Sequence, residues 1–245
     1  MPSVTLFHRE HVDSTNREAH RMVEANKLTP CWIVADTQSA GSGRGGKKWH
    51  SEKGNFFGSF IFSPTIAPAH MGQVSLLAAL AVHSASIALA PSAPLILKWP
   101  NDVITKSGEK LAGILSESLL INGDMVEWAC LGIGVNLVSA PELSGPSACY
   151  LAKWAKHPLQ PLSFLEILDD QLQSLLTLWK EQGFEPLRQK FLSLAYGLGE
   201  EIDISSETMR FIDIAPNGAM VVENKNKLRQ TIHAGEISLN RKKDA

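Results

Sequence analysis

The chain has 245 residues, a formal net charge of −2 and 44% hydrophobic residues, which suits one large globular domain or a medium domain followed by a small one. A nucleic-acid-binding protein usually carries a strongly basic face, so the near-neutral charge disfavours that class. Three cysteines lie far apart without metal-ligand spacing, which disfavours a zinc site and a disulfide framework and predicts buried free thiols.

The N-terminal residues, MPSVTLFHREH, lack the apolar core of a signal peptide. We expect no stretch of membrane-spanning length elsewhere in the chain. A soluble, cytoplasmic protein is therefore expected.

A strand is expected over residues 4–7, and a helix within VDSTNREAHRMVEA. Thr15 and Glu18 have the spacing of a capping box, and the apolar residues that follow recur at helical spacing. The simplest interpretation of Ser14, Thr15 and Asn16 is therefore that they cap this helix.

Residues 38–55, QSAGSGRGGKKWHSEKGN, are rich in glycine and in basic residues and follow an expected strand over residues 31–36. Backbone amides that approach a ligand closely, together with fixed cations, are typical of phosphate sites. The dinucleotide-binding GxGxxG and the Walker A pattern both nearly fit. Both require a helix immediately afterwards, whereas an extended segment and the turn-forming Gly54-Asn55 follow here, so we reject both.

A strand is expected over residues 56–63, followed by a helix from about Val74 to Leu89. The next apolar strand, in LILKWPND, ends with Lys98, Trp99, Pro100, Asn101 and Asp102. The residues after the proline have a plain turn interpretation. A lysine on a largely buried strand, however, needs an anion as partner.

Residues 103–137 predict a β-meander, because turn residues at 106–109 and 122–124 separate apolar runs. The meander places Lys110 at the start of a strand. It also places Gly113 where a ligand could pass close to the backbone.

Helices are expected again after Pro146. A capping box at Ser163 and Glu166 begins a long amphipathic helix that ends at Gly183, and a shorter helix covers residues 184–194. From about residue 195 the sequence pattern changes to five short strands separated by turns, which predicts a small barrel.

The order of these motifs resembles the biotin–protein ligase family from end to end: DSTN, QSAGSGRGGKKW, KWPND, KLAGIL-S-E, GIGVNL and GEISL. Gly41 to Trp49 aligns without a gap on the family's motif Gly-Arg-Gly-Arg-Arg-Gly, basic residues and Trp. Only 13 residues precede Ser14, too few for the N-terminal DNA-binding domain of the family's repressor members. The resemblance therefore implies a monofunctional, catalytic-only ligase.

The fold implied by the resemblance is α+β, with a mixed, largely antiparallel sheet backed by helices as in class II aminoacyl-tRNA synthetases. A small C-terminal SH3-like barrel follows. The expected domains are a catalytic biotin- and ATP-binding ligase domain, residues 1–194, and the SH3-like domain, residues 195–245.

The implied reaction has two steps. The biotin carboxylate attacks the α-phosphate of ATP to give biotinyl-5′-AMP and diphosphate, and a lysine of a biotin carboxyl carrier protein of acetyl-CoA carboxylase then takes the biotin. Mg²⁺ is expected with ATP, and the protein is expected to bind neither DNA nor membranes and to be a monomer or weak homodimer.

The resemblance implies site residues at the positions of this chain that match the family's motifs. Arg44 and Lys110 match the catalytic residues, since a planar guanidinium and an ammonium hold carboxylate and phosphate oxygens. Asp102 matches a Mg²⁺ contact. The expected biotin contacts are Ser14, Thr15, Asn16, Gln38, Gly41, Arg44, Trp49, Lys110 and Gly113. The expected ATP and adenylate contacts are Arg44, Lys98, Asn101, Lys110 and Asn136.

The chain departs from the family motif at two positions. Ser42 and Gly45 stand where the family usually has basic residues. We therefore expect weaker retention of biotinyl-AMP, with adenylation preserved through Arg44 and Lys110. We also expect residues 41–53 to act as a mobile lid that orders over biotinyl-AMP and excludes water.

Three alternatives remain at this point. A lipoate–protein ligase or octanoyltransferase would share the core fold, but those families lack this glycine–arginine loop. A non-catalytic biotin sensor is motivated by the missing loop cations, and biotin-dependent exchange of pyrophosphate into ATP would distinguish it from an enzyme. A DNA-binding repressor would show salt-dependent operator binding.

Overall fold

The computed structural model describes residues 4–25, 27, 29–142, 147–204, 207–235 and 237–239. Its largest element is a seven-stranded sheet with the strand order β1-β2-β3-β7-β6-β5-β4. The first two strands are parallel and every other neighbouring pair is antiparallel, as expected for the mixed sheet. The strands are β1 (Thr5–Val12), β2 (Cys31–Gln38), β3 (Phe56–Phe62), β4 (Leu95–Lys98), β5 (Asp102–Thr105), β6 (Lys110–Asn122) and β7 (Met125–Val135).

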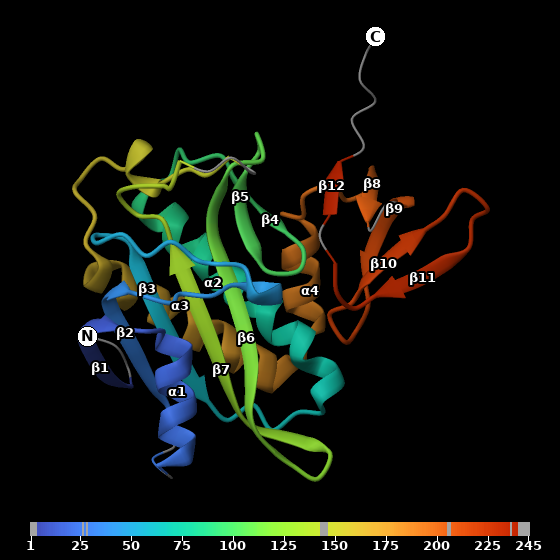
Figure 1. Ribbon diagram of the computed structural model, residues 1–245. Helices are drawn as coiled ribbons and strands as arrows, with labels where there is room; N and C mark the ends of the chain where they lie inside the picture. Colours follow the sequence, from blue (N-terminus) through green and yellow to red (C-terminus); the bar gives the residue numbers. More distant parts are fainter. Residues whose placement is uncertain are drawn as a thin grey trace.

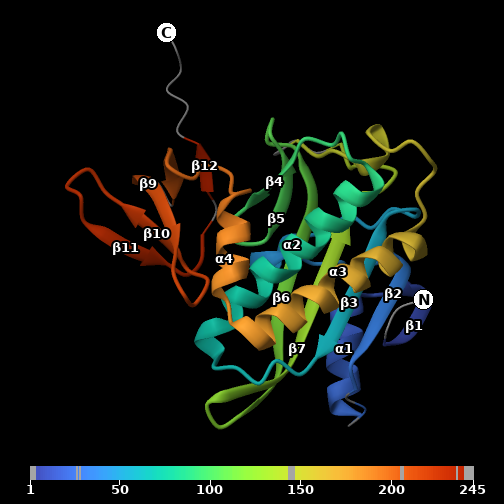
Figure 2. The same ribbon diagram turned by 180° about the vertical axis from the view of Figure 1, so that it is seen from behind.

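Helices cover both faces of this sheet. Helix α1 (Thr15–Glu24) lies on the face turned toward the reader in Figure 1, which we call the front face. The segment between β2 and β3 crosses the same face. Helices α2 (Met71–Leu89) and α3 (Pro161–Gln182) cover the opposite face, which Figure 2 shows from behind, and α4 (Glu185–Leu192) packs against both. Short 3₁₀ helices lie at Arg44–Gly46, Pro68–His70 and Leu151–Lys153.

The alternation of side chains along each strand separates two buried clusters. Phe56 and Phe60 of β3 face the helices behind the sheet and belong to the main core with Trp32 and Phe164. Ile61, one position on, faces α1 in a smaller cluster that includes Cys31 and Cys130. The same alternation leaves the rest of the front face open for a ligand.

All three cysteines are buried free thiols, as predicted. Burial raises the pKa of Cys31 to about 11 and that of Cys149 to about 12, and it raises the pKa of Cys130 as well. These thiols are therefore poor nucleophiles at neutral pH.

The expectation that no stretch of the chain reaches membrane-spanning length is wrong. The helical segment Pro68–Leu89 has 22 residues and is long and apolar enough to cross a membrane by length and composition. Its apolar character has another cause, because 67% of its most apolar window is buried inside the fold. A helix that is apolar on all sides is typical of a core position between two layers.

Both predicted capping boxes are also wrong. Helix α1 begins at Thr15 with Ser14 as N-cap, the Ser14 side chain makes no capping hydrogen bond, and the Glu18 carboxylate accepts a hydrogen bond from Arg21 at 2.7 Å. Helix α3 begins at Pro161, two residues before Ser163. A proline in the first turn fits there because its missing N–H would have no partner inside the helix.

The C-terminal strands form a second, antiparallel sheet in the order β11-β10-β9-β8-β12. Its five strands match the predicted number and fit an SH3-like domain, but in the described residues no pairing joins β11 to β12, so the expected barrel is an open sheet here. The strands are β8 (Glu201–Ile204), β9 (Glu207–Ile214), β10 (Met220–Glu223), β11 (Arg229–Ile232) and β12 (Ile237–Leu239).

A turn of the second sheet packs directly on the first domain. Trp99 Nε1 donates to the Gly218 carbonyl at 3.1 Å, and Gln73 Nε2 donates to the Pro216 carbonyl at 2.6 Å. A Cβ added to Gly218, whose φ is +86°, would lie 2.6 Å from the Gln73 nitrogen. The contact therefore requires glycine at this position for two reasons, the left-handed backbone and the close approach.

We expect Gly218→Ala to lower the free energy of unfolding well beyond the cost of a left-handed alanine alone, about 1–2 kcal/mol. Gly199→Ala is the matched control, because Gly199 has a φ of +81° and open space where its Cβ would stand. Urea denaturation of the two variants measures the difference. Equal losses would contradict a packing role for the Gly218 turn.

Candidate functional site

A cavity of about 500 Å³ lies on the front face of the large sheet, between α1, the segment after β2 and the ends of β4 and β5. Its floor is the β6–β7 pair, where glycines occupy three of the front-facing positions. Gly113 lies opposite Gly134, and Leu115 lies opposite Gly132. Strand positions without side chains leave room for a ligand directly on the backbone.

The glycine-rich segment after β2 folds into a small hairpin across this floor. Trp49 N donates to the Gly41 carbonyl at 2.8 Å, and Gly43 N donates to the Lys47 carbonyl at 2.6 Å. Gly45, at the tip, has a φ of +65°, which the lack of a side chain permits. The absence of a following helix, predicted from the sequence, is confirmed. The segment is held by its own pairing, and its mobility stays a prediction.

Trp49 ends this hairpin and lies against the glycines of the floor. A Cβ on Gly113 would lie 3.1 Å from Trp49 Cζ3, and one on Gly134 would lie 2.6 Å from Trp49 Nε1. The indole nitrogen is buried and makes no hydrogen bond in the described residues. The indole therefore depends on both glycines for its place in the cavity.

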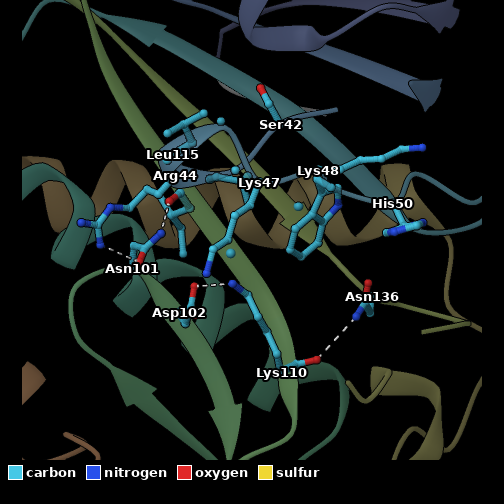
Figure 3. Close-up of a pocket in the computed structure, with 18 of the residues that line it drawn as sticks. Ser42, Arg44, Lys47, Lys48, His50, Asn101, Asp102, Lys110, Leu115 and Asn136 are labelled. Atoms are coloured by element: carbon cyan, nitrogen blue, oxygen red, sulfur yellow. Dashed lines mark hydrogen bonds and ion pairs between the residues drawn. The ribbon is translucent and has the colours of Figure 1, made fainter. Parts of the chain in front are cut away.

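Cationic side chains gather at one end of the cavity (Figure 3). Lys110 Nζ lies 2.7 Å from Asp102 Oδ1 and 5.6 Å from the centre of the Trp49 ring. Arg44 Nη1 donates to Asn101 Oδ1 at 3.4 Å, while the Asn101 amide donates to the Ile114 carbonyl at 2.6 Å. Two cationic side chains, those of Lys110 and Arg44, therefore lie at this end of the cavity, and the Asp102 carboxylate of β5 pairs with Lys110.

The loop residues divide by direction in Figure 3. Lys47 points toward Asp102 and Lys110, whereas Lys48 points away from them. Ser42 also points away from this group and forms an isolated bridge with Lys48 across the hairpin. Of the two lysines that follow the tip of the hairpin, only Lys47 is directed toward Lys110.

The other end of the cavity is neutral and polar. Thr15 donates to Gln38 Oε1 through its backbone nitrogen at 2.8 Å, and the two side chains lie 3.2 Å apart at Thr15 Oγ1 and Gln38 Oε1. Gln38 Nε2 donates to Ser51 Oγ at 3.0 Å. Ser14, Thr15 and Asn16 are all buried, which explains why polar residues begin α1 without capping it.

Two further residues, which the sequence predicted to contact the nucleotide, also line the cavity. Lys98 does so from the end of β4, and Asn136 from just beyond β7. The Asn136 amide donates to the Cys149 carbonyl at 3.1 Å, so its position is fixed by backbone.

Gly41 is the exception among the predicted residues, because it does not line the cavity. A Cβ there would lie 2.8 Å from both the Trp49 carbonyl and Ser51 Oγ. The hairpin packing accounts for this glycine without a ligand.

Ser59 and Glu117 were not predicted, yet they support the neutral end from behind. Ser59 Oγ lies 2.8 Å from Thr15 Oγ1, and Glu117 Oε2 accepts from Asn16 Nδ2 at 2.6 Å. The sequence signal that could have identified them is a polar or charged residue on a largely apolar strand. Strand alternation assigns Ser59 in FFGSFIF and Glu117 in KLAGILSESLL to the front face.

Comparison with known proteins agrees with this geometry. Residues 9–136 match the family described as Biotin/lipoate A/B protein ligase family. The chain is 35% identical over 235 residues to a biotin–[acetyl-CoA-carboxylase] ligase of Paracoccus denitrificans, a match that covers 92% of this chain and 96% of that protein. It is 28% identical to the bifunctional ligase/repressor BirA of Bacillus subtilis, covering 96% of this chain and 74% of that protein.

A solved structure gives the same result. The biotin protein ligase from Aquifex aeolicus in complex with biotin and ATP matches with a TM-score of 0.80 and 28% identity, covering 97% of this chain and 99% of that one. Together with the family match over half of the chain, these similarities establish that this protein belongs to the biotin/lipoate A/B protein ligase family.

Proposed function

We propose that this protein activates biotin with ATP to biotinyl-5′-AMP and transfers the biotin to one lysine of a biotin carboxyl carrier protein of acetyl-CoA carboxylase. The observation that carries the proposal is a single cavity with a neutral polar end at Thr15 and Gln38 and a cationic end at Lys110 and Arg44. Biotin has a neutral ureido ring at one end and a carboxylate at the other. The names of the Paracoccus and Aquifex relatives support the same substrates.

The chemistry needs no nucleophile from the enzyme. Two anions that repel each other, the biotin carboxylate and the α-phosphate, must be aligned for in-line attack. Lys110 and Arg44 reach the same end of the cavity from β6 and from the loop hairpin, and their charges would stabilise the oxygens of both groups. The Lys110–Asp102 pair holds the ammonium in place before the substrates bind.

The remaining roles follow from position. In the proposed complex, Ser14, Thr15, Asn16 and Gln38 hold the ring, and Gly113 and Trp49 flank the aliphatic chain. Lys98, Asn101 and Asn136 contact the nucleotide. Gly41 serves the hairpin rather than the ligand.

The described residues contain no cluster of three His, Cys, Asp or Glu side chains that could hold a metal ion by itself. Mg²⁺ strongly favours phosphate and water oxygens with one or two carboxylates, so we propose that it enters with ATP and that Asp102 is its one candidate protein ligand.

The wider setting is also a proposal. We assign the catalytic domain to residues 1–194 and the SH3-like domain to residues 195–245, and we place the protein in the cytoplasm as a monomer or weak homodimer. Its net charge of −2 favours a protein acceptor over DNA as the macromolecular partner.

Biotin-dependent exchange of labelled pyrophosphate into ATP, followed by mass spectrometry of a biotin carboxyl carrier domain, tests the proposal. We expect exchange with biotin and none with lipoate or octanoate, and one added biotin on the carrier. Lys110→Met should lower the exchange rate roughly 10²-fold or more, because a charge facing the transition state is lost. Lys106→Met, on the exposed turn before β6, is the control and should change little. No exchange by the wild type would favour a biotin sensor instead.

Gly134→Ala should raise the Michaelis constant for biotin roughly tenfold or more, since 1.4 kcal/mol of lost contact is already a factor of ten. The new methyl group would stand 2.6 Å from Trp49 Nε1, so either the indole or the ligand must move. Steady-state kinetics with biotin and ATP varied separately measure the effect. An unchanged biotin constant, or an equal rise for ATP, would contradict the placement of the biotin chain along this floor.

Ser42→Arg should slow the release of biotinyl-AMP severalfold while leaving its rate of formation unchanged. The reason is that Ser42 and Gly45 leave the hairpin with fewer cations than the family motif, and position 42 lines the cavity. Release is timed by filtration of the preformed complex. Lys48→Arg, which keeps the charge, is the control, and the same release time for wild type and Ser42→Arg would refute the hypothesis.

A further inference from the structure

The second sheet contributes to the wall of the cavity. Residues 98–102, which run from the end of β4 to the start of β5, all line the cavity, and so does Gly235 between β11 and β12. Figures 1 and 2 both show the second sheet beside the β4–β5 edge of the large sheet. Both sheets therefore form the cavity at this place, and we call residues 98–102 the wall segment.

Backbone hydrogen bonds anchor the wall segment near both of its ends. Just before it, Leu97 N donates to the Leu194 carbonyl at 2.9 Å, and the Leu97 carbonyl accepts from Tyr196 N at 2.8 Å. Toward its other end, Ile114 N of β6 donates to the Asn101 carbonyl at 2.9 Å. Trp99 lies between these anchors, so its side chain decides how the middle of the segment is held.

The Trp99 indole is bound to a fixed acceptor. It is 2% exposed, and its Nε1 donates to the Gly218 carbonyl of the second sheet at 3.1 Å. The Gly218 turn lies directly on α2, because a Cβ on Gly218 would stand 2.6 Å from Gln73 N. Gln73 Nε2 also donates to the Pro216 carbonyl of this turn at 2.6 Å. A buried N–H requires an acceptor, so the place of this carbonyl determines the orientation of the indole.

We propose that Trp99 is a positioning residue, which uses its bond to the second sheet to hold Lys98 and Asn101 in the place where they contact the nucleotide. The inference rests on the proposed function, in which these two residues contact ATP. Asn101 N donates to the Lys98 carbonyl at 3.2 Å, so one turn connects both residues to Trp99. A shift of the indole therefore changes where both side chains stand.

The neutral end of the cavity should be insensitive to this contact. Thr15 and Gln38 are held by hydrogen bonds to each other, to Ser59 and to Ser51. These bonds connect α1, β2, β3 and the loop hairpin, and none of them involves the wall segment. Loss of the Trp99 bond should therefore weaken the binding of ATP and leave the binding of biotin unchanged.

Trp99→Phe removes the indole N–H and keeps an aromatic ring in the wall. Trp179→Phe is the matched control, because Trp179 Nε1 donates to Gln73 Oε1 at 2.9 Å beside the same turn, but Trp179 does not line the cavity. The Pro216 carbonyl keeps its donor, Gln73 Nε2, in this control. Both variants lose one indole hydrogen bond, so their free energies of unfolding in urea should fall by similar amounts.

We expect Trp99→Phe to raise the Michaelis constant for ATP in pyrophosphate exchange roughly three- to tenfold, the value of one hydrogen bond. The Kd of biotin, measured by titration calorimetry without ATP, should stay unchanged. Trp179→Phe should change neither constant. A merely structural role of Trp99 would affect stability without separating ATP from biotin.

A double substitution tests whether Trp99 acts through the turn. Gly218→Ala displaces the acceptor, so it should raise the Michaelis constant for ATP by itself, whereas Gly199→Ala, which has open space for its Cβ, should not. Trp99→Phe combined with Gly218→Ala should be little worse than either alone, because both remove the same contact.

Three outcomes would overturn the positioning role alone. They are an unchanged Michaelis constant for ATP in Trp99→Phe, an equal rise in Trp179→Phe, and independent effects of Trp99→Phe and Gly218→Ala that multiply in the double variant. The last result would mean that the ring acts on the nucleotide directly. A wild-type protein without biotin-dependent pyrophosphate exchange would overturn the proposed function and this inference together.

Discussion

The site depends on one steric constraint, the absence of side chains at three front-facing positions of β6 and β7. Gly113, Gly132 and Gly134 form a floor on which Asn16 and Trp49 lie in direct contact with backbone. Strand alternation turns the neighbouring Ile114, Ile133 and Val135 toward the helices behind, where they are buried in the main core. The same two strands thus supply both the hydrophobic core and the hollow, and a one-residue register shift would destroy both.

The floor separates two kinds of polar environment. At one end, uncharged groups of α1 and β2 are fixed by hydrogen bonds to one another and to β3. At the other end, Lys110 and Arg44 lie with Asp102 and Asn101. Keeping these ends apart prevents the Lys110 charge from competing for the hydroxyl and amide groups that a neutral ring requires. The separation of the neutral end from the cationic end, rather than any single residue, therefore favours a ligand with one neutral and one anionic end.

Most strands could be predicted because their patterns are local: the apolar runs at 31–36 and 56–63 and the turns at 106–109 and 122–124 need no tertiary information. The capping boxes failed because Thr15 and Ser163 are governed by contacts or a proline that the spacing alone does not reveal. The cationic end was predicted from motif order. Glu117 was not predicted, because its role depends on Asn16, which lies 101 positions earlier in the chain. Only the packing of α1 against the sheet brings Asn16 Nδ2 within 2.6 Å of Glu117 Oε2.

The hairpin joins these features into one unit. Because Gly41 pairs with Trp49 and Gly43 with Lys47, Arg44 near the tip and Trp49 at the base belong to the same hydrogen-bonded hairpin. A displacement that lifts the indole from Gly134 must also withdraw the guanidinium from Asn101. The buried Trp49 Nε1 has no acceptor in the described structure, and an unpaired buried donor costs about 1–3 kcal/mol. A ligand oxygen beside that nitrogen would remove this cost, so ligand binding would stabilise the hairpin in the position that also holds Arg44 at the cavity.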